Sequence, residues 1–266
     1  MCMRVLPNIE LTEEQYDYIC KYNYFGEGAE SDIYKISKKN IAKIWSSGAY
    51  LEIENKFQKI KALYQIEELE QINDIKIISS ISYNGEIIGY QMTFSRGIPY
   101  YKLSKYRNVS RKEKLEIFMR TRQKIKQFAD LGIIYCDIHE GNILIGRHRV
   151  TFCDLDNVAI PKLGLEIDAR TKLNDIFLRE YGKFDEKISS FVLNMFTLQE
   201  LCFLNLVNYR RVFKKLKTFS KMNAVPIEFE PERYYAILEQ MSNITPEYEG
   251  LYLTDYVKPT YKSLIK

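Results

Sequence analysis

The sequence is poor in glycine and proline, with 12 and 7 residues among 266, and it has only two histidines. Disordered chains are typically rich in proline and glycine and poor in aromatic residues. Here 21 tyrosines and 14 phenylalanines accompany an apolar fraction of 46%. The composition therefore argues against disorder. It predicts a folded chain with a sizeable core, arranged as one domain of two lobes or as two small domains.

A long hydrophobic run is also missing. The most apolar stretch, "FVLNMFTLQELCFLNLV" at residues 191–207, contains two asparagines, a glutamine and a glutamate. It is shorter than the ~20 apolar residues that a membrane-spanning helix needs. The first 15 residues contain acids and a proline but no apolar signal core. We therefore expect residues 191–207 to form a helix buried in a protein core, and we expect no membrane partner.

Neither the cysteines nor the net charge points to a special class of protein. The five cysteines are odd in number and form no CxxC pair, which predicts reduced thiols and a cytoplasmic protein. The net charge is +4, from 39 basic and 35 acidic side chains. This excess is too small to indicate a nucleic-acid partner by itself.

The first part of the chain reads mostly as strands. "YNYFGEGAESDIYKIS" alternates around a glycine-containing turn, and "NIAKIW" follows as a second short strand. Residues 50–71 place apolar side chains at helical spacing. "DIKIISSISYNGEIIGYQMTF" then predicts two strands joined by Asn84-Gly85, a strong hairpin signal. We expect a small β-rich lobe with one helix over residues 1–95.

The remainder reads mostly as helices. Residues 110–131 predict a helix with Ser110 as a possible N-cap, and "RVTFCDLD" predicts a short strand. From about residue 170 onward helical patterns follow one another. The predicted fold class is α+β, with a larger, mostly helical lobe over residues 96–266 and a hinge near residues 93–99.

Two features of the β-rich part could bind phosphate. Gly26 and Gly28 in "FGEGAESDIYKI" lie between two strand-like runs, where backbone amides can approach a phosphate closely. Alone, such a pair is more often a turn. Lys43 is a single cation among apolar residues, and a buried charge needs a partner or a ligand. The alternative is an edge strand with Lys43 pointing to water.

Three polar residues of the second part have the chemistry of a magnesium site. Asp137 and Asn142 lie five residues apart in "YCDIHEGNILI", and Asp154 follows in "FCDLDN". Amide and carboxylate oxygens are suitable ligands for Mg²⁺ that carries phosphates. Asp137 would then orient a hydroxyl or accept its proton. Asp137 and Asn142 could instead be turn residues, and Asp154 a helix cap.

These features, in this order, resemble the protein-kinase-like superfamily, which includes eukaryotic-type protein kinases and the aminoglycoside and choline phosphotransferases. The resemblance covers roughly residues 22–207. It is strongest in "GIIYCDIHEGNILI…VTFCDLD", which looks like the catalytic loop followed by the metal-binding aspartate. It implies a two-lobed fold, ATP and Mg²⁺ as cofactors, and transfer of the γ-phosphate to a hydroxyl of a protein or a small molecule.

The resemblance also implies residue roles. Asp137, Lys43 and Asn142 would be catalytic, and Asn142 and Asp154 would bind the metal. Residues at nucleotide-binding positions are Gly26 and Gly28 in the glycine-rich loop, Lys43 at the α- and β-phosphates, Ile33, Ile41 and Leu144 around the adenine, and Met92, Thr93 and Phe94 at the hinge.

The family's lysine usually pairs with a glutamate on the following helix. Glu54 is the choice here and Glu52 the alternate, although both stand closer to Lys43 in sequence than is usual. Asp185 resembles the aspartate that opens the buried helix supporting the catalytic loop. Its role would be structural.

The chain departs from the protein-kinase pattern at several positions. Ser31 replaces the third glycine of the loop, and Tyr135-Cys136 replaces the usual His-Arg before Asp137. His139 stands where protein serine/threonine kinases usually have lysine, either near the γ-phosphate or supporting the loop. Asp156 could add an oxygen near the metals or cap the next segment. No Ala-Pro-Glu-like segment follows Asp154.

These departures leave three interpretations open. A bacterial-type protein serine/threonine kinase is the first expectation. A small-molecule kinase, acting on an aminoglycoside, choline-like or sugar hydroxyl, is the second. A pseudokinase or nucleotide-dependent binding module is the third.

Overall fold

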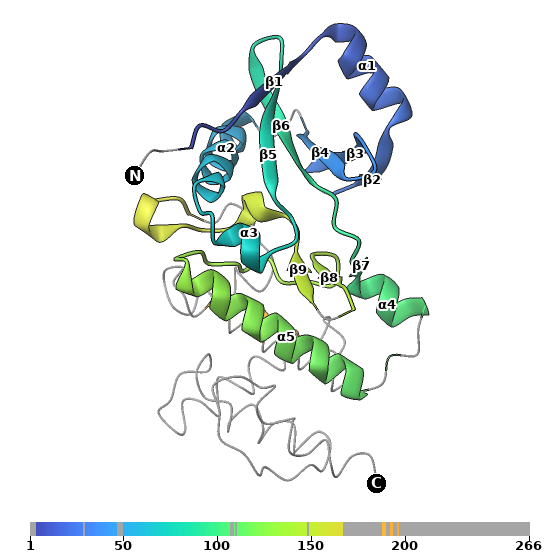
Figure 1. Cartoon of the computed structure of the whole chain (residues 1–266), viewed down its shortest axis with the longest axis vertical. Helices are drawn as coiled ribbons and strands as arrows, with labels where there is room; N and C mark the ends of the chain where they lie inside the picture. Colours follow the sequence, from blue (N-terminus) through green and yellow to red (C-terminus); the bar gives the residue numbers. More distant parts are fainter. Residues whose placement is uncertain are drawn as a thin grey trace. The chain divides into compact units, whose positions relative to one another are not determined.

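The computed structural model describes residues 4–28, 30–46, 50–106, 109, 111–147 and 149–166, together with residues 188, 189, 192, 193 and 196. The chain divides into two compact units. Unit 1 comprises Met1–Gly97, Leu131–Ile133 and Thr151–Asp168; unit 2 comprises Ile98–Asp130, Ile134–Val150 and Ala169–Lys266. The fold is of mixed α+β class, as the sequence predicts (Figure 1).

Unit 1 is built on a six-stranded mixed sheet with the order β1-β5-β6-β4-β3-β2. The neighbouring strands β1 and β5 are parallel, and the other pairs are antiparallel. The strands are β1 (Asn8–Leu11), β2 (Tyr24–Glu27), β3 (Ser31–Lys35), β4 (Asn40–Trp45), β5 (Ile77–Tyr83) and β6 (Glu86–Thr93). The helices of this part of the chain are α1 (Glu13–Tyr22), α2 (Tyr50–Tyr64) and α3 (Leu69–Ile72).

The hairpin predicted at Asn84-Gly85 is confirmed. Strands β5 and β6 pair antiparallel up to Tyr83 and Glu86. Asn84 and Gly85 both have positive φ angles, of 53° and 78°. Only a turn of this hand follows the twist of the flanking strands, and asparagine and glycine adopt it at the least steric cost.

The prediction of one helix in the first 95 residues is wrong. Helix α1 precedes the first predicted strand, and residues 50–71 form two helices, α2 and α3. The start of α1 carries a capping box in which the side chain of Thr12 accepts from the N–H of Gln15 while the side chain of Gln15 accepts from the N–H of Thr12. This Thr-x-x-Gln pattern is readable in the sequence and marks a helix start.

The two faces of the sheet have different surroundings. On one face Leu11, Tyr34, Ala42, Ile44 and Ile81 form a buried apolar cluster. Side chains of α1 pack against this cluster. Because successive strand residues point to opposite faces, the neighbours of Ala42 and Ile44 along β4 point away from it. These neighbours include Lys43, the cation that the sequence analysis singled out.

Unit 2 contains a long helix and two strands of a small sheet, whose third strand passes from unit 2 into unit 1 at residues 150–151. Strands β7 (Ile98–Pro99), β8 (Ile143–Ile145) and β9 (Val150–Phe152) form a three-stranded sheet in that order. Helix α4 (Tyr100–Tyr106) leads to α5 (Arg111–Asp130), which agrees with the helix predicted at residues 110–131. The predicted N-cap Ser110 lies outside the described residues. Short 3₁₀ turns, η2 (Leu155–Asn157) and η3 (Pro161–Leu163), belong to unit 1.

The buried face of α5 supports an aromatic cluster. Phe118 contacts the rings of Tyr100 and Phe196, with centroids 5.8 and 5.4 Å away. Val192, Leu193 and Phe196 are helical and buried, as expected for the apolar stretch at residues 191–207, whose other residues lie outside the described part. Within the described residues no helix is long and apolar enough to cross a membrane.

Gly89 fixes how closely β6 approaches the strand that carries Lys43. A Cβ at Gly89 would lie 2.1 Å from the backbone oxygen of Lys43. We expect Gly89→Ala to lower the free energy of unfolding by about 2–4 kcal/mol, because two strand backbones must separate. Denaturant unfolding measures the change. Gly146→Ala is the control, since among the described residues its Cβ would meet only the backbone oxygen of Arg149, at 3.5 Å. Equal, small effects of the two changes would contradict this strand register.

Candidate active site

Lys43 is buried in the middle of the six-stranded sheet. Its strand, β4, lies between β3 and β6, and the residue is 4% exposed. The alternative of an edge strand with Lys43 in water is therefore wrong. The ammonium group donates to Asp154 Oδ1 and, at 2.7 Å, to Asp156 Oδ1. A buried ammonium needs such partners, because its desolvation is otherwise strongly unfavourable.

The strand register places three predicted adenine-binding residues on the same sheet face as Lys43. Ile33 on β3 is the cross-strand partner of Lys43. Ile41 lies two residues before Lys43 and pairs with Met92 on β6. Cross-strand partners and alternate residues share a face. The structure therefore brings Ile33, Ile41 and Met92 together around the lysine.

The remaining predicted hinge and adenine residues are placed differently. Thr93 points to the other face, and its hydroxyl donates to the backbone oxygen of Asp74, at 2.9 Å. The ring of Phe94 meets the ring of Phe25 edge-on, with centroids 5.5 Å apart. Leu144 lies on β8 and belongs to unit 2.

The glycine-containing turn joins β2 and β3 in unit 1. Gly26 pairs with Ile33, and a Cβ added at Gly26 would meet none of the described residues within 4 Å. The N–H of Gly28 donates to the backbone oxygen of Ser31, at 2.7 Å. Glu30, in the same turn, accepts from Lys56 of α2 at 2.5 Å. This ion pair ties the turn to the helix.

Asp154 follows β9 in a strained conformation. Its φ and ψ are 61° and 48°, in the left-handed region that non-glycine residues seldom occupy. The end of β9 is held by Asn73, whose side chain bonds both the N–H and the oxygen of Phe152. Besides Lys43, the carboxylate of Asp154 accepts from Asn157 Nδ2 at 2.7 Å. Strain of this kind clusters at functional sites and supports a role for Asp154.

Asp156 is the most enclosed member of the cluster. It is fully buried and accepts three hydrogen bonds through its carboxylate. Lys43 and the hydroxyl of Tyr90 donate to Oδ1, at 2.7 and 3.1 Å, and Trp45 Nε1 donates to Oδ2 at 2.7 Å. From the sequence, this residue is a candidate metal ligand or a cap of the next segment. The structure instead makes its carboxylate the partner of the buried lysine and two aromatic side chains.

The charges of this cluster reinforce one another. Burial by itself would lower the pKa of Lys43, but Asp154 and Asp156 outweigh it and raise that pKa well above its ordinary value. Burial would likewise raise the pKa of Asp156, yet Lys43 and Trp45 hold it below the ordinary value. Burial and the neighbouring Asp156 charge raise the pKa of Tyr90 well above 10. The lysine and aspartate are therefore both charged, and Tyr90 keeps its proton to donate.

The expected helix partner of Lys43 is corrected by the structure. Glu54 is exposed and accepts from Gln58, one turn further along α2. The alternate, Glu52, lies 4.0 Å from Lys56. Neither glutamate pairs with Lys43, because α2 presents Lys56 in its buried face where a carboxylate was expected.

Asp137 and Asn142 meet in a tight loop of unit 2. Asn142 Nδ2 donates to Asp137 Oδ2 at 2.9 Å and to the backbone oxygen of Asp137 at 3.2 Å. The N–H of Asn142 donates to the oxygen of His139 at 3.1 Å. Both side chains are buried. The five-residue spacing thus lets the amide brace the carboxylate across the turn.

His139 is part of the same loop. Its Nδ1 accepts from the N–H of Gly141 at 3.1 Å, and its Nε2 lies 3.9 Å from Asp137 Oδ1. In the neutral ring, a Nδ1 that accepts a hydrogen bond leaves the proton on Nε2. The structure therefore gives His139 a loop-supporting contact and a position beside the predicted catalytic carboxylate.

The predicted metal ligands have donor atoms that fit Mg²⁺. Asp154 supplies a carboxylate whose side chain is 25% exposed, and the amide oxygen of Asn142 is also a hard donor. Mg²⁺ is usually bound by one or two protein carboxylates, with the other positions taken by waters and phosphates. Among the described residues no group of three or more histidine, cysteine or acidic side chains forms a metal site by itself. An Mg²⁺ at Asp154 would therefore need further ligands, such as waters or phosphate oxygens. The predicted structural residue Asp185 lies outside the described residues.

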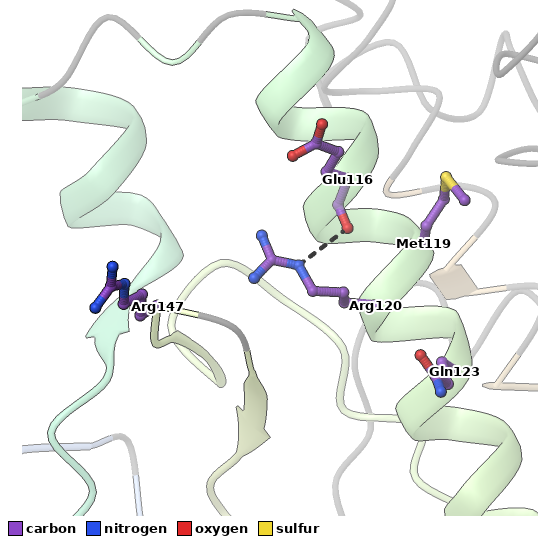
Figure 2. Close-up of a pocket in the computed structure, with 5 residues that line it drawn as sticks. All are labelled: Glu116, Met119, Arg120, Gln123 and Arg147. Carbon is purple, nitrogen blue, oxygen red and sulfur yellow. Dashed lines mark hydrogen bonds between the residues drawn. The ribbon is translucent and has the colours of Figure 1, made fainter.

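An open surface pocket of unit 2 lies among residues that were not predicted. It is lined by four residues of α5 (Glu116, Met119, Arg120 and Gln123) and by Arg147, two residues after β8. Figure 2 shows the side chain of Arg120 extending from α5 on the side of Arg147. Arg120 Nε donates to the backbone oxygen of Glu116 at 3.3 Å. None of these five residues belongs to the clusters around Lys43 and Asp137.

Sequence reasoning missed Trp45 and Tyr90 as members of the site. Trp45 was detectable, since it lies two residues after Lys43 on the same strand and is the single tryptophan of the chain. Tyr90 pairs with Lys43 across β4 and β6, a register that no local pattern specified.

In comparisons with known proteins, no family model matches the chain, and no curated protein matches it.

Proposed function

We propose that this chain is an ATP-dependent phosphotransferase with a protein-kinase-like, two-lobed fold. The observation that carries the proposal is the buried Lys43 ammonium held against Asp154, a carboxylate in a strained backbone position. Lys43, Asp154 and Asp156 sum to one negative charge, so the cluster favours the arrival of a divalent cation together with phosphates. A merely structural ion pair has no need of a strained, partly exposed carboxylate.

In this proposal, different residues bind the phosphates, the metal and the adenine of ATP. Lys43 donates to phosphate oxygens of ATP, and the absence of a side chain at Gly26 on β2 lets backbone amides approach them. Asp154 and Asn142 would hold Mg²⁺, which neutralises phosphate charge when bound. Ile33, Ile41 and Met92 supply an apolar surface for the adenine.

Asp137 acts on the acceptor. Its carboxylate accepts the proton of the acceptor hydroxyl as the oxygen attacks the γ-phosphorus. The bond from that phosphorus to the bridging oxygen breaks, and ADP leaves with the electron pair. Asn142 braces the carboxylate, so that the base is fixed before the acceptor arrives. Our leading proposal for the acceptor is a serine or threonine hydroxyl of a protein.

The test is incubation of the purified full chain with γ-labelled ATP and Mg²⁺, alone, with generic protein substrates, and with a mixture of aminoglycosides, choline and sugars. Label in protein, absent from an Asp137→Asn variant, is the expected result. Label only in a small alcohol would replace the acceptor class. A parallel reaction with α-labelled ATP identifies transfer of AMP.

Binding without transfer is measured in the same samples. A thermal shift with ATP and Mg²⁺, but no label in any acceptor, would replace the enzyme by a nucleotide-dependent binding module. Absence of both label and thermal shift would overturn the proposed function.

A further inference from the structure

The lysine that contacts phosphates must be held in place by something other than the nucleotide. An unrestrained ammonium samples many rotamers, and ordering it on binding weakens affinity. In this chain Lys43 has two carboxylate partners, which differ in their surroundings. Asp154 is partly exposed and is also the proposed metal ligand, whereas Asp156 is fully buried.

Asp156 is itself held rigidly from several directions. Trp45 lies on β4, the strand of Lys43, and donates to Oδ2 of Asp156. Tyr90 lies opposite Lys43 on β6 and donates to Oδ1. Both donors are buried, at 5% and 0% exposure, and their rings lie 5.8 Å apart. The carboxylate thus has three fixed donors and no freedom to follow a ligand.

Helix α2 offers no competing anchor. Its two acidic residues, Glu52 and Glu54, are exposed: Glu54 bonds Gln58, and Glu52 lies 4.0 Å from Lys56. The buried residues of the helix include the cation Lys56, which is paired with Glu30 of the glycine-containing turn. The carboxylates that contact Lys43 come instead from the segment after β9.

We propose that Asp156 is the positioning residue that holds Lys43 for the nucleotide, in place of an acid on α2. The inference rests on the proposed function and adds to it. Asp154 and Asp156 are two residues apart in one short turn. The backbone of this turn therefore positions both the proposed metal ligand and the carboxylate that holds Lys43. When Asp154 is engaged with a metal and phosphates, Lys43 keeps Asp156 as its partner.

Trp45 provides a direct readout. It is the only tryptophan in the chain, and its indole N–H donates to Asp156. The experiment titrates ADP into the full chain, with Mg²⁺ and separately with EDTA, and follows tryptophan emission and nucleotide affinity. Wild-type protein is expected to bind ADP in both conditions, more weakly with EDTA, with a change in Trp45 emission.

The decisive variants are Asp156→Asn and Glu54→Gln. Asp156→Asn is expected to weaken ADP binding about tenfold or more with Mg²⁺ and to raise the KM for ATP, since Asp154 is then engaged with the metal and the remaining negative charge beside Lys43 is lost. The KM for the acceptor should not change. Glu54→Gln, which tests the competing anchor, is expected to stay within about twofold of wild type. Asp17→Asn, an exposed change on α1, is the matched control.

Two milder variants cover the case in which Asp156→Asn does not fold. Tyr90→Phe and Trp45→Phe each remove one donor to Asp156 and keep an aromatic ring in place. Each is expected to weaken ADP binding about three- to tenfold, and isothermal titration replaces the emission signal for Trp45→Phe.

Three results would overturn the inference. The first is unchanged nucleotide affinity in folded Asp156→Asn. The second is unchanged affinity in both milder variants. The third is a loss in Glu54→Gln as large as in Asp156→Asn. A wild-type chain that binds no nucleotide would overturn the proposed function and this inference with it. Nucleotide affinity that is the same in wild type and in folded Asp156→Asn would overturn the inference alone.

Discussion

Asp154→Asn is expected to reduce turnover at least about 10³-fold while the protein stays folded. The change removes the charge that would hold the metal and leaves the shape of the side chain. Asparagine tolerates the left-handed backbone that residue 154 adopts. It can also still accept from Asn157, and Lys43 retains Asp156. The loss therefore reports on chemistry rather than on folding.

The measurement is kcat with ATP and Mg²⁺, together with denaturant unfolding of the same preparation. Asp17→Asn on the exposed surface of α1 serves as the matched change of charge. Full activity in folded Asp154→Asn would refute the metal assignment. A large loss of stability would instead make Asp154 a structural partner of Lys43.

Asp137→Asn is expected to lower kcat about 10²–10⁴-fold, the range for loss of a general base. The new amide can accept from Asn142 through its oxygen, so the loop keeps the contact that now spans 2.9 Å. Because Asp137 acts on the acceptor, the KM for ATP should change little.

The effects on kcat and on the binding of the magnesium nucleotide distinguish the role of Asp137 from that of Asp154. Asp154→Asn should weaken the response to Mg²⁺ with ATP, whereas Asp137→Asn should bind the magnesium nucleotide as wild type does. Steady-state kinetics with varied ATP and a thermal shift with ATP and Mg²⁺ measure both effects. A variant at Asp137 that keeps wild-type kcat would remove the residue from the proposed catalytic set.

Local signals identified most elements of unit 1 and the long helix of unit 2. The Asn84-Gly85 turn and the helical spacing of residues 111–130 were readable because the physics that forms them is contained within a few residues. Helix α1 also carried such a signal, in Thr12 and Gln15, although it was not predicted. The loop from Asp137 to Asn142 is local in the same sense, since its bonds join residues five apart.

What the sequence by itself determined is therefore the residue types and the short-range geometry: a cation in an apolar strand, a braced carboxylate in a tight loop, and an acid after a short strand. Only the tertiary structure decided which charge neutralises Lys43. Its partners are 111 and 113 residues away, whereas the expected helix glutamate, Glu54, is close in sequence and bonds Gln58 instead. No periodicity records such a pairing, because the cost of burying an ammonium is met by whichever carboxylate the packing of strands, helix and turn places beside it.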